Sequence, residues 1–135
     1  MKILSTILLV VMVCSGCGGY MAQDIRLYNR EQLGNLELGM PRAMVFDTMG
    51  DETFSTDVAI NNPYRIEMFQ AEDGTPVEVL FYYTDVKDDD NAISDEELTP
   101  IVLIDGEVVG WGWFCLRQHL PEGSLETRNV IEISR

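Results

Sequence analysis

Few residues in this 135-residue chain could carry out catalysis. His119 is the only histidine, so a Ser-His-Asp or Cys-His set would have to be built around it. No G-x-S-x-G sequence supplies a nucleophile on a sharp turn. Cys115 and His119 are spaced to share a helix face, but a stable zinc site needs two further ligands. The sequence therefore predicts a protein that is not an enzyme and that has no cofactor and no resident metal.

Two other cysteines, Cys14 and Cys17, follow an apolar run of about eleven residues, Ile3–Val13. Spanning a bilayer takes about twenty residues, so this run fits the hydrophobic part of an export signal instead. The small residues Ser15 and Gly16 precede Cys17, whereas bulky residues precede Cys14. This pattern resembles a bacterial lipoprotein signal peptide that is cleaved before the cysteine to which lipid is attached.

Residues 1–16 are therefore the expected signal peptide, and Cys17 is the expected lipid attachment site, as in palmitate-carrying lipoproteins. Cys14 would leave with the signal, so a C-x-x-C redox pair would not survive processing. Gly18 follows Cys17 in place of the Asp that commonly retains lipoproteins at the inner membrane. We expect a lipid-anchored cell-envelope protein, at the outer membrane and facing the periplasm if the source has two membranes. Plain secretion is the alternative.

Composition limits the partners of the remaining 119 residues, which suffice for one domain. The chain has a formal net charge of −14, and removal of Lys2 with the signal makes it one unit more negative. Such a surface repels nucleic acid and anionic headgroups, so lipid must supply the membrane attachment. Cys115 then remains as the single thiol, and its bulky apolar neighbours favour a buried hydrophobic role over a reactive one.

The acidic stretch Asp85–Glu97 is a candidate cation loop, because calcium binds six to eight clustered oxygens. An EF-hand register that starts at Asp88 places Asp90 correctly but fails at Ala92 and has Ile93 where glycine is required. A calcium loop of another type remains an alternative. The favoured interpretation is a solvated connection between strands, whose like charges discourage edge aggregation.

Hydrophobic periodicity predicts two helices followed by strands. A capping box at Asn29 predicts a short helix to Leu33. Pro41 and Gly50 predict a second helix, Pro41–Met49, with Met44, Val45 and Met49 on one face. We expect residues 17–25 to form a tether, 26–115 a domain, and 116–135 a tail of uncertain structure with a short strand at Val130–Ile133.

The second half of the domain alternates with a period of two. Apolar residues alternate with Arg65 and Glu67 from Tyr64, and the alternation resumes after a turn at 72–75 and continues to Tyr83. The pair Asp105-Gly106 predicts a two-residue hairpin between strands at Pro100–Ile104 and Glu107–Trp113. The predicted fold is α+β, with two short N-terminal helices packed on a three- to four-stranded antiparallel meander.

Two tryptophans are the candidate partner-binding residues. In an uninterrupted strand, Val109, Trp111 and Trp113 share one face, while Gly110 and Gly112 share the other. Tryptophan is enriched at binding hot spots, although a core position is the alternative. The glycine face forms a bare strip, over which we expect the helix at 41–49 to pack.

Two segments resemble known lipoproteins. The string L-x-L-G-M-x-x-x-x-V-x-x-x-M-G, Leu36–Gly50, resembles the helix motif of the SmpA/OmlA (BamE-like) lipoprotein domain, although a polar cap is usual there in place of Pro41. The string T-P-I-V-L-I-D-G-E-V-V-G-W-G-W, Thr99–Trp113, resembles a group of short uncharacterised bacterial lipoproteins. This resemblance implies two helices on an antiparallel sheet, and a role in outer-membrane protein assembly. Of the functional residues, it transfers only Cys17.

The sequence thus predicts a non-catalytic protein-binding or scaffolding module of the cell envelope, with a role in outer-membrane assembly or maintenance. Its expected contacts are the membrane, through the N-terminal lipid, and a protein partner in the envelope, and not nucleic acid. A periplasmic enzyme inhibitor is the first alternative, because related folds inhibit β-lactamases. A calcium-binding envelope protein is the second.

Overall fold

The computed structural model describes residues 21–55, 59–88, 90 and 92–126. Within these ranges every helix is too short or too polar to cross a membrane. The helices and strands follow in chain order as α1 Ala22–Leu33, α2 Arg42–Met49, β1 Thr53–Ser55, β2 Ala59–Asn61, β3 Arg65–Gln70, β4 Pro76–Tyr83, the 3-10 helix η1 Asp95–Glu97, β5 Leu98–Ile104, β6 Glu107–Trp111 and α3 Trp113–His119.

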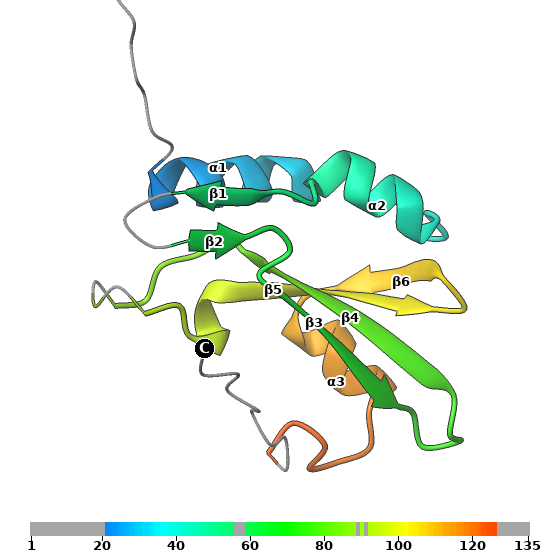
Figure 1. Cartoon of the computed structure of the whole chain (residues 1–135). Coiled ribbons are helices and arrows are strands. Elements are labelled where there is room, and N and C mark those ends of the chain that lie inside the picture. The colour runs from blue at the N-terminus through cyan, green and yellow to red at the C-terminus, as the bar shows by residue number, and fades with distance from the viewer. Residues whose placement is uncertain (1–20, 56–58, 89, 91, 127–135) are drawn as a thin grey trace, which may run out of the picture.

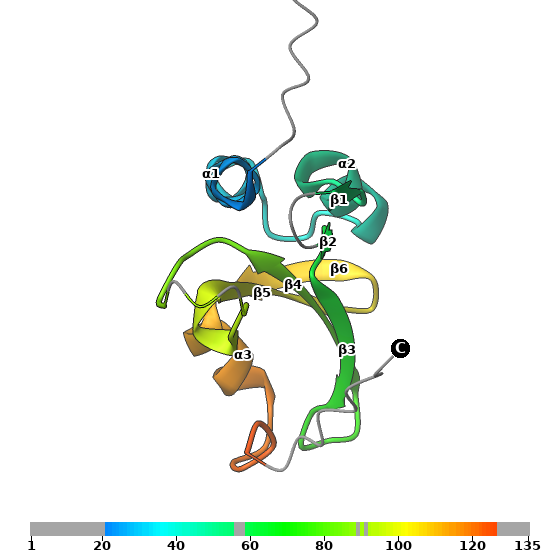
Figure 2. The ribbon, with the colours of Figure 1, turned by 60° about the vertical axis from the view of Figure 1, so that its left-hand side comes forward.

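The elements form layers around an antiparallel four-stranded sheet with the order β3-β4-β5-β6. Helices α1 and α2 and the small β1–β2 hairpin lie on one side of this sheet, and α3 lies on the other (Figures 1 and 2). The predicted α+β class, with two short N-terminal helices on an antiparallel meander, is confirmed. The hairpin and α3 were not expected from the sequence.

Helix α1 begins at Ala22, inside the segment expected to be a tether and seven residues before the predicted cap at Asn29. The Asp24 carboxylate accepts the backbone N–H of Met21 at 3.0 Å, which stabilises the first turn. Ile25 and Asn29 are one helical turn apart, and both are buried. The capping prediction at Asn29 is therefore wrong, because its amide is used in the interior.

Helix α2 ends at Met49 as predicted and begins one residue later than predicted, at Arg42, with Pro41 at its N-cap and Gly50 at its C-cap. Gly50 has φ +92°, a conformation that glycine adopts without steric cost. Val45 and Met49 are fully buried against the sheet, whereas Met44 is half exposed. The expected buried face of this helix is therefore confirmed for two of its three residues.

Strand β4 is buried on both faces and carries the centre of the core. Its alternate side chains Val77, Val79 and Phe81 belong to the cluster that includes Leu116 of α3. The intervening Leu80 and Tyr82 belong to the cluster that includes Val45 and Met49 of α2. Each face of the sheet thus has its own apolar core, as the period of two requires.

The β5–β6 hairpin turns at Asp105 and Gly106, as predicted, and both residues have positive φ. Gly110 pairs with Val102, but Val108 pairs with Leu103, so Val109 is an extra residue in a β-bulge. The bulge reverses which residues of β6 share a face.

Because of the bulge, Gly110 faces α3. A Cβ added there would lie 2.4 Å from the Cys115 Sγ, while one added at Gly112 would meet no atom within 4 Å. The hypothesis that α2 crosses a strip formed by both glycines is therefore wrong. A helix does cover one of them, but it is α3, and Gly112 is the residue at which β6 ends and α3 begins.

A buried amide pair joins α1 to the segment between β2 and β3. The Nδ2 groups of Asn29 and Asn62 each donate to the other residue's Oδ1 at 2.9 Å. The second hydrogen of each amide goes to a backbone carbonyl, that of Tyr83 for Asn29 and that of Met49 for Asn62, at 2.8 Å in both cases. All four N–H donors are therefore satisfied, which makes burial of two polar side chains acceptable.

Candidate functional site

The predicted anchor lies outside the described residues. This applies to Cys14, to Cys17 and to the expected signal peptide, and also to the strand proposed at Val130–Ile133. The described chain begins at Met21, next to the N-terminus of α1. Ala22 is the fifth residue after Cys17 in the sequence. This short spacing sets an upper limit on the distance between a lipid-modified cysteine and the domain.

Cys115 and His119 lie on the same side of α3, as their spacing predicts. The Cys115 Sγ is 3.8 Å from the His119 Nδ1, and this nitrogen lies 2.9 Å from the Cys115 carbonyl oxygen. Burial raises the pKa of the Cys115 thiol, which disfavours the thiolate that nucleophilic catalysis or metal binding requires. The thiol packs against the core cluster on the α3 side of the sheet.

The acidic stretch connects β4 to β5, and Glu97 organises it from the inside. This side chain is buried and accepts the N–H of Lys87 at 3.0 Å and the N–H of Ser94 at 2.7 Å. The aspartates at 88 and 90 are exposed. Over the ranges that the structure describes, no three His, Cys, Asp or Glu side chains are grouped in a way that could hold a metal ion.

The two tryptophans lie in different environments. The Trp113 indole N–H donates to the Leu98 carbonyl at 2.8 Å, and its ring packs against Phe81 with the centroids 5.7 Å apart. Trp111 ends β6 and is 36% exposed. The predicted common face is wrong, because the strand ends between them at Gly112, where φ is +89°. Trp113 thus links α3 to the sheet, and of the two only Trp111 is an exposed large hydrophobic residue.

The most unusual surface is on strand β3, where the ordinary pattern of burial is reversed. Ile66 and Met68 are 46% and 64% exposed, while the charged residues that alternate with them, Arg65 and Glu67, are partly buried. Arg65 lies over the Phe81 ring, 4.4 Å from its centroid, and its guanidinium pairs with Glu67 and Asp95. The predicted alternation of side chains along this strand is confirmed. An alternation with a period of two does not show which face of the sheet is covered by other elements.

Ile66 and Met68 remain uncovered because the helices do not reach them. They lie opposite Leu80 and Glu78 of β4, on the sheet face that α2 covers further along. Figure 2 shows β3 curving away from α1 and α2 at the end of the sheet. We call Ile66, Met68 and the adjoining Arg42–Glu78 ion pair the β3 surface.

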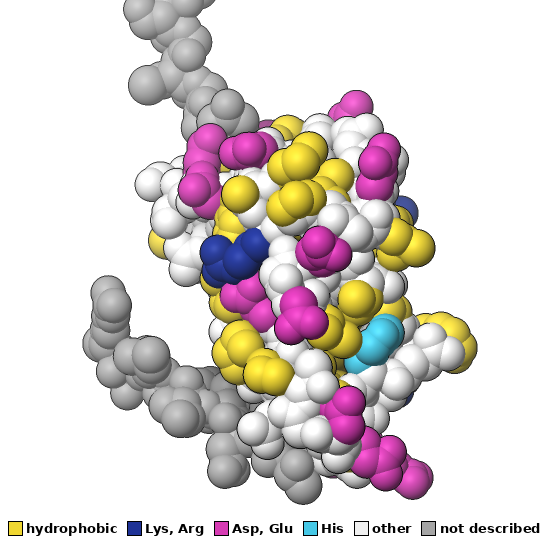
Figure 3. All heavy atoms as spheres, turned by 90° about the vertical axis from the view of Figure 1, so that its right-hand side faces the viewer, with side chains coloured by type: hydrophobic (Ala, Val, Ile, Leu, Met, Phe, Trp, Pro, Cys, Tyr) yellow, Lys and Arg dark blue, Asp and Glu magenta, His cyan; other side chains and the backbone are white. Residues whose placement is uncertain are grey.

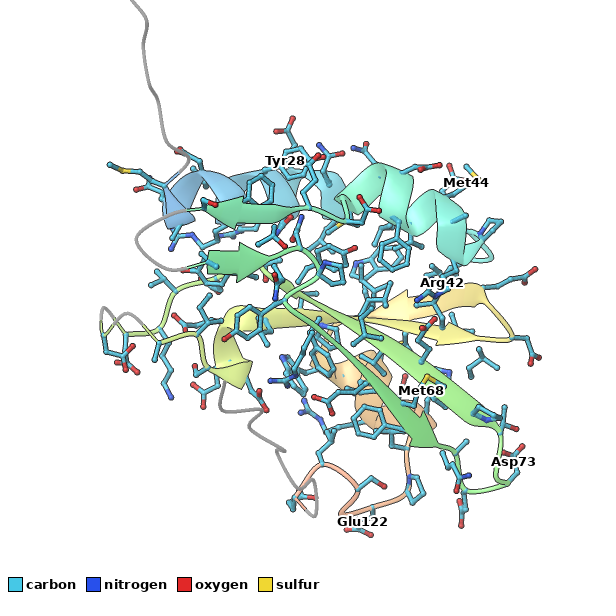
Figure 4. The ribbon with its side chains drawn as sticks, viewed as in Figure 1. Tyr28, Arg42, Met44, Met68, Asp73 and Glu122 are labelled. Carbon is cyan, nitrogen blue, oxygen red and sulfur yellow. The ribbon has the colours of Figure 1, made fainter. Side chains whose placement is uncertain are left out.

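The Arg42–Glu78 pair connects α2 to this surface. The Arg42 Nε lies 2.7 Å from the Glu78 Oε1, and the guanidinium also lies over the Phe46 ring. Figure 4 shows Arg42 and Met68 at the same end of the molecule, one on α2 and the other on β3. Seen from that side, hydrophobic and acidic side chains predominate and basic ones are sparse (Figure 3).

Strand β3 is also the last strand of the sheet, and no described residue pairs with its outer edge. A shallow hollow of about 740 Å³ adjoins its final residues, on the side of Pro121 and Ser124. An edge of this kind presents unpaired backbone N–H and C=O groups, which can pair with an extended chain. The β3 surface thus combines exposed apolar side chains with an available backbone edge.

Comparison with known proteins gives one result. A family model described as "Protein of unknown function (DUF3192)" matches residues 9–118. No curated protein and no solved structure is significantly similar to the chain. The expected membership of the SmpA/OmlA (BamE-like) group is wrong, because the matching model is a different one and covers both motifs on which that resemblance rested. With 110 of its 135 residues matched, the chain belongs to the DUF3192 family.

Proposed function

We propose that this protein is a lipid-anchored, non-catalytic module of the bacterial cell envelope that binds a protein partner through the β3 surface. The observation that carries the proposal is the reversed pattern of β3, which exposes Ile66 and Met68 on a strand whose outer edge pairs with none of the described residues. Apolar side chains on an open edge create a risk of aggregation unless a partner covers them.

The expected mode of binding is addition of an extended segment to β3. Main-chain hydrogen bonds along the edge would supply affinity, and alternate side chains of the segment would contact Ile66 and Met68. The chain's net charge of −14 favours a partner with basic residues around the docking segment. The same charge opposes a second copy of this chain as the occupant, because two such surfaces repel each other.

The proposed anchor is Cys17, and the support for it is the short apolar run followed by the small residues Ser15 and Gly16. Ala22 is the fifth residue after Cys17, so the Cα atoms of these two residues can be at most about 18 Å apart. A lipid on Cys17 would therefore hold the domain close to the membrane surface. The proposed location is the periplasmic face of the outer membrane, with a partner in the same compartment.

The binding proposal is tested by capture from detergent-solubilised envelopes, with the intact lipoprotein as bait. Met68→Lys places a charge on the edge strand, so we expect the captured partner to decrease by about tenfold or more. Leu38→Lys is the matched control, because Leu38 is also an exposed apolar residue but lies between α1 and α2. Equal capture by both variants and the wild type would show that the β3 surface is not the binding site.

The anchor is tested separately. Cys17→Ser should abolish labelling with a fatty-acid analogue and release the protein from the membrane fraction, since lipid is its proposed attachment. Cys14→Ser should leave the labelling largely intact. Labelling that persists in the Cys17→Ser protein would contradict the assignment.

A further inference from the structure

A cavity of about 210 Å³ lies between α1 and β1 and shares no residue with the β3 surface. We propose that it binds an organic cation, namely an ammonium group on a short apolar stem. The cavity is smaller than the 300–1,000 Å³ typical of drug-sized ligands, so it suits one side chain or a small amine. Its lining residues are Asp24, Ile25, Tyr28, Gly50, Glu52 and Phe54.

The walls of the cavity are apolar and aromatic. Ile25 is fully buried and forms part of the lining, and the rings come from two elements, Tyr28 from α1 and Phe54 from β1. Figure 2 looks nearly along α1 and shows β1 beside it, and Figure 4 shows Tyr28 on α1 above β1. Aromatic rings attract a cation placed over their faces, and because Tyr28 is 42% exposed the attraction here is the modest one of a solvent-accessible ring.

The base of the cavity is fixed by buried hydrogen bonds. The Gly50 carbonyl accepts the Tyr82 hydroxyl at 3.0 Å, and the Asn62 amide donates to the Met49 carbonyl. A Cβ at Gly50 would lie 3.3 Å from the Asn62 Nδ2, so a side chain at this position would crowd the base. The cavity is thus held open before a ligand arrives, which reduces the entropy lost on binding.

Two carboxylates lie on the lining, one from each side. Asp24 is in the first turn of α1 and Glu52 immediately precedes β1. Neither takes part in any of the ion pairs found within the described ranges. Asp24 accepts one backbone hydrogen bond, from Met21, but its charge is not neutralised by it. Two carboxylates that form no ion pair with a described residue and that line a cavity with aromatic rings are suited to an organic cation and unfavourable for an anion.

Two sources could supply this group, a lysine side chain of a protein or a free polyamine. The test is an NMR titration of the full chain in non-ionic detergent, with N-acetyl-lysine methylamide and spermidine as separate probes. We expect saturable shifts of the amides of Ile25, Tyr28 and Gly50 with at least one probe. The probe that binds more tightly identifies the source. The uncharged analogue N-acetyl-norleucine methylamide should give no saturable shift.

Variants identify the groups responsible. Asp24→Asn and Glu52→Gln should each weaken binding by about threefold, and Tyr28→Leu by a similar factor, as expected for partly exposed charge and ring contacts. Glu72→Gln, an exposed acid in the β3–β4 turn, is the matched control and should bind like the wild type. The proposal is overturned if neither cation gives saturable shifts, if the norleucine analogue binds equally well, or if Glu72→Gln weakens binding as much as Glu52→Gln.

Discussion

The two outer edges of the sheet differ in what lies beside them. At β6, the N–H of Gly39 donates to the Val108 carbonyl at 2.7 Å, and the N–H of Val108 donates to the Met40 carbonyl at 3.0 Å. At β3, the described residues offer no such pairing. The segment before α2 therefore closes one edge of the sheet, while the other edge has no partner strand among the described residues and is the edge proposed to pair with an extended chain.

The side chains differ in the same sense. Val108 on the closed edge is 2% exposed and packs beneath the helix layer, while Met68 on the open edge is largely exposed. Natural proteins usually protect an open edge with charged residues, yet the charges of β3 at Arg65 and Glu67 are turned toward the α3 side and pair there. We therefore expect the first edge to contribute more to stability than the second, which is the edge proposed for recognition.

The largest expected effect comes from truncating a side chain beside the closed edge. Leu103 pairs with Val108 and is 1% exposed, so Leu103→Ala should lower the free energy of unfolding by about 2–5 kcal/mol. Met68→Ala on the open edge should change it by less than about 0.5 kcal/mol. Denaturant titration of both proteins measures the difference. Similar losses for both would show that Met68 is packed as tightly as Leu103.

The next effect tests how α3 packs on β6. Gly110→Ala should cost about 1–3 kcal/mol, because its Cβ would overlap the Cys115 Sγ and because a side chain is strained at its φ of +156°. Adding Cys115→Ala removes the sulfur, so a double-mutant cycle should show recovery of part of this loss. Gly112→Ala is the control, since its Cβ would meet open space and only the positive φ opposes it. Without recovery in the double mutant, close packing would not be the reason for glycine at position 110.

The smallest effect concerns the ion pair between α2 and the sheet. Glu78→Gln should reduce stability by about 0.2–1 kcal/mol, because Arg42 is nearly half exposed and solvent screens the pair. The hydrogen bond with Glu78 raises the pKa of Arg42, so Arg42 stays charged at every pH at which the fold is tested. The difference between variant and wild type should shrink in 1 M NaCl, measured by thermal unfolding, whereas a salt-independent loss would indicate that the pair acts through packing.

The local elements with strong sequence signals were predictable. Pro41 and Gly50 delimited α2, and the Asp105-Gly106 pair placed the β5–β6 turn, because these residues restrict or permit backbone conformations by themselves. Helix α3 was missed because, in the sequence, Trp111 and Trp113 continue the alternating pattern of the preceding strand. In the structure the strand ends before Gly112, which is the N-cap of α3. The start of α1 was missed because Asn29 has the composition of a cap but is used in a buried amide pair.

The candidate sites were less predictable, because exposure depends on which elements cover a face. The alternation around Ile66 and Met68 is the same whether a helix lies above them or not. The cavity at Tyr28 joins residues of α1 with Glu52 and Phe54, which are more than twenty positions away in sequence. Neither surface has a motif of its own, so only the spatial arrangement brings its residues together.

The sequence by itself determined the α+β class, the boundaries of α2, the β5–β6 turn and the strongly acidic charge, since each depends on local conformation or on composition. The tertiary structure decided that β3 exposes its apolar residues, that Gly110 faces α3 and that Asn29 is buried. The physical reason is that these features depend on contacts between distant segments. The extra residue in the β6 bulge changes which side chains face α3, and the position of the helices decides whether β3 is covered. Neither feature alters the hydrophobic pattern of the local sequence.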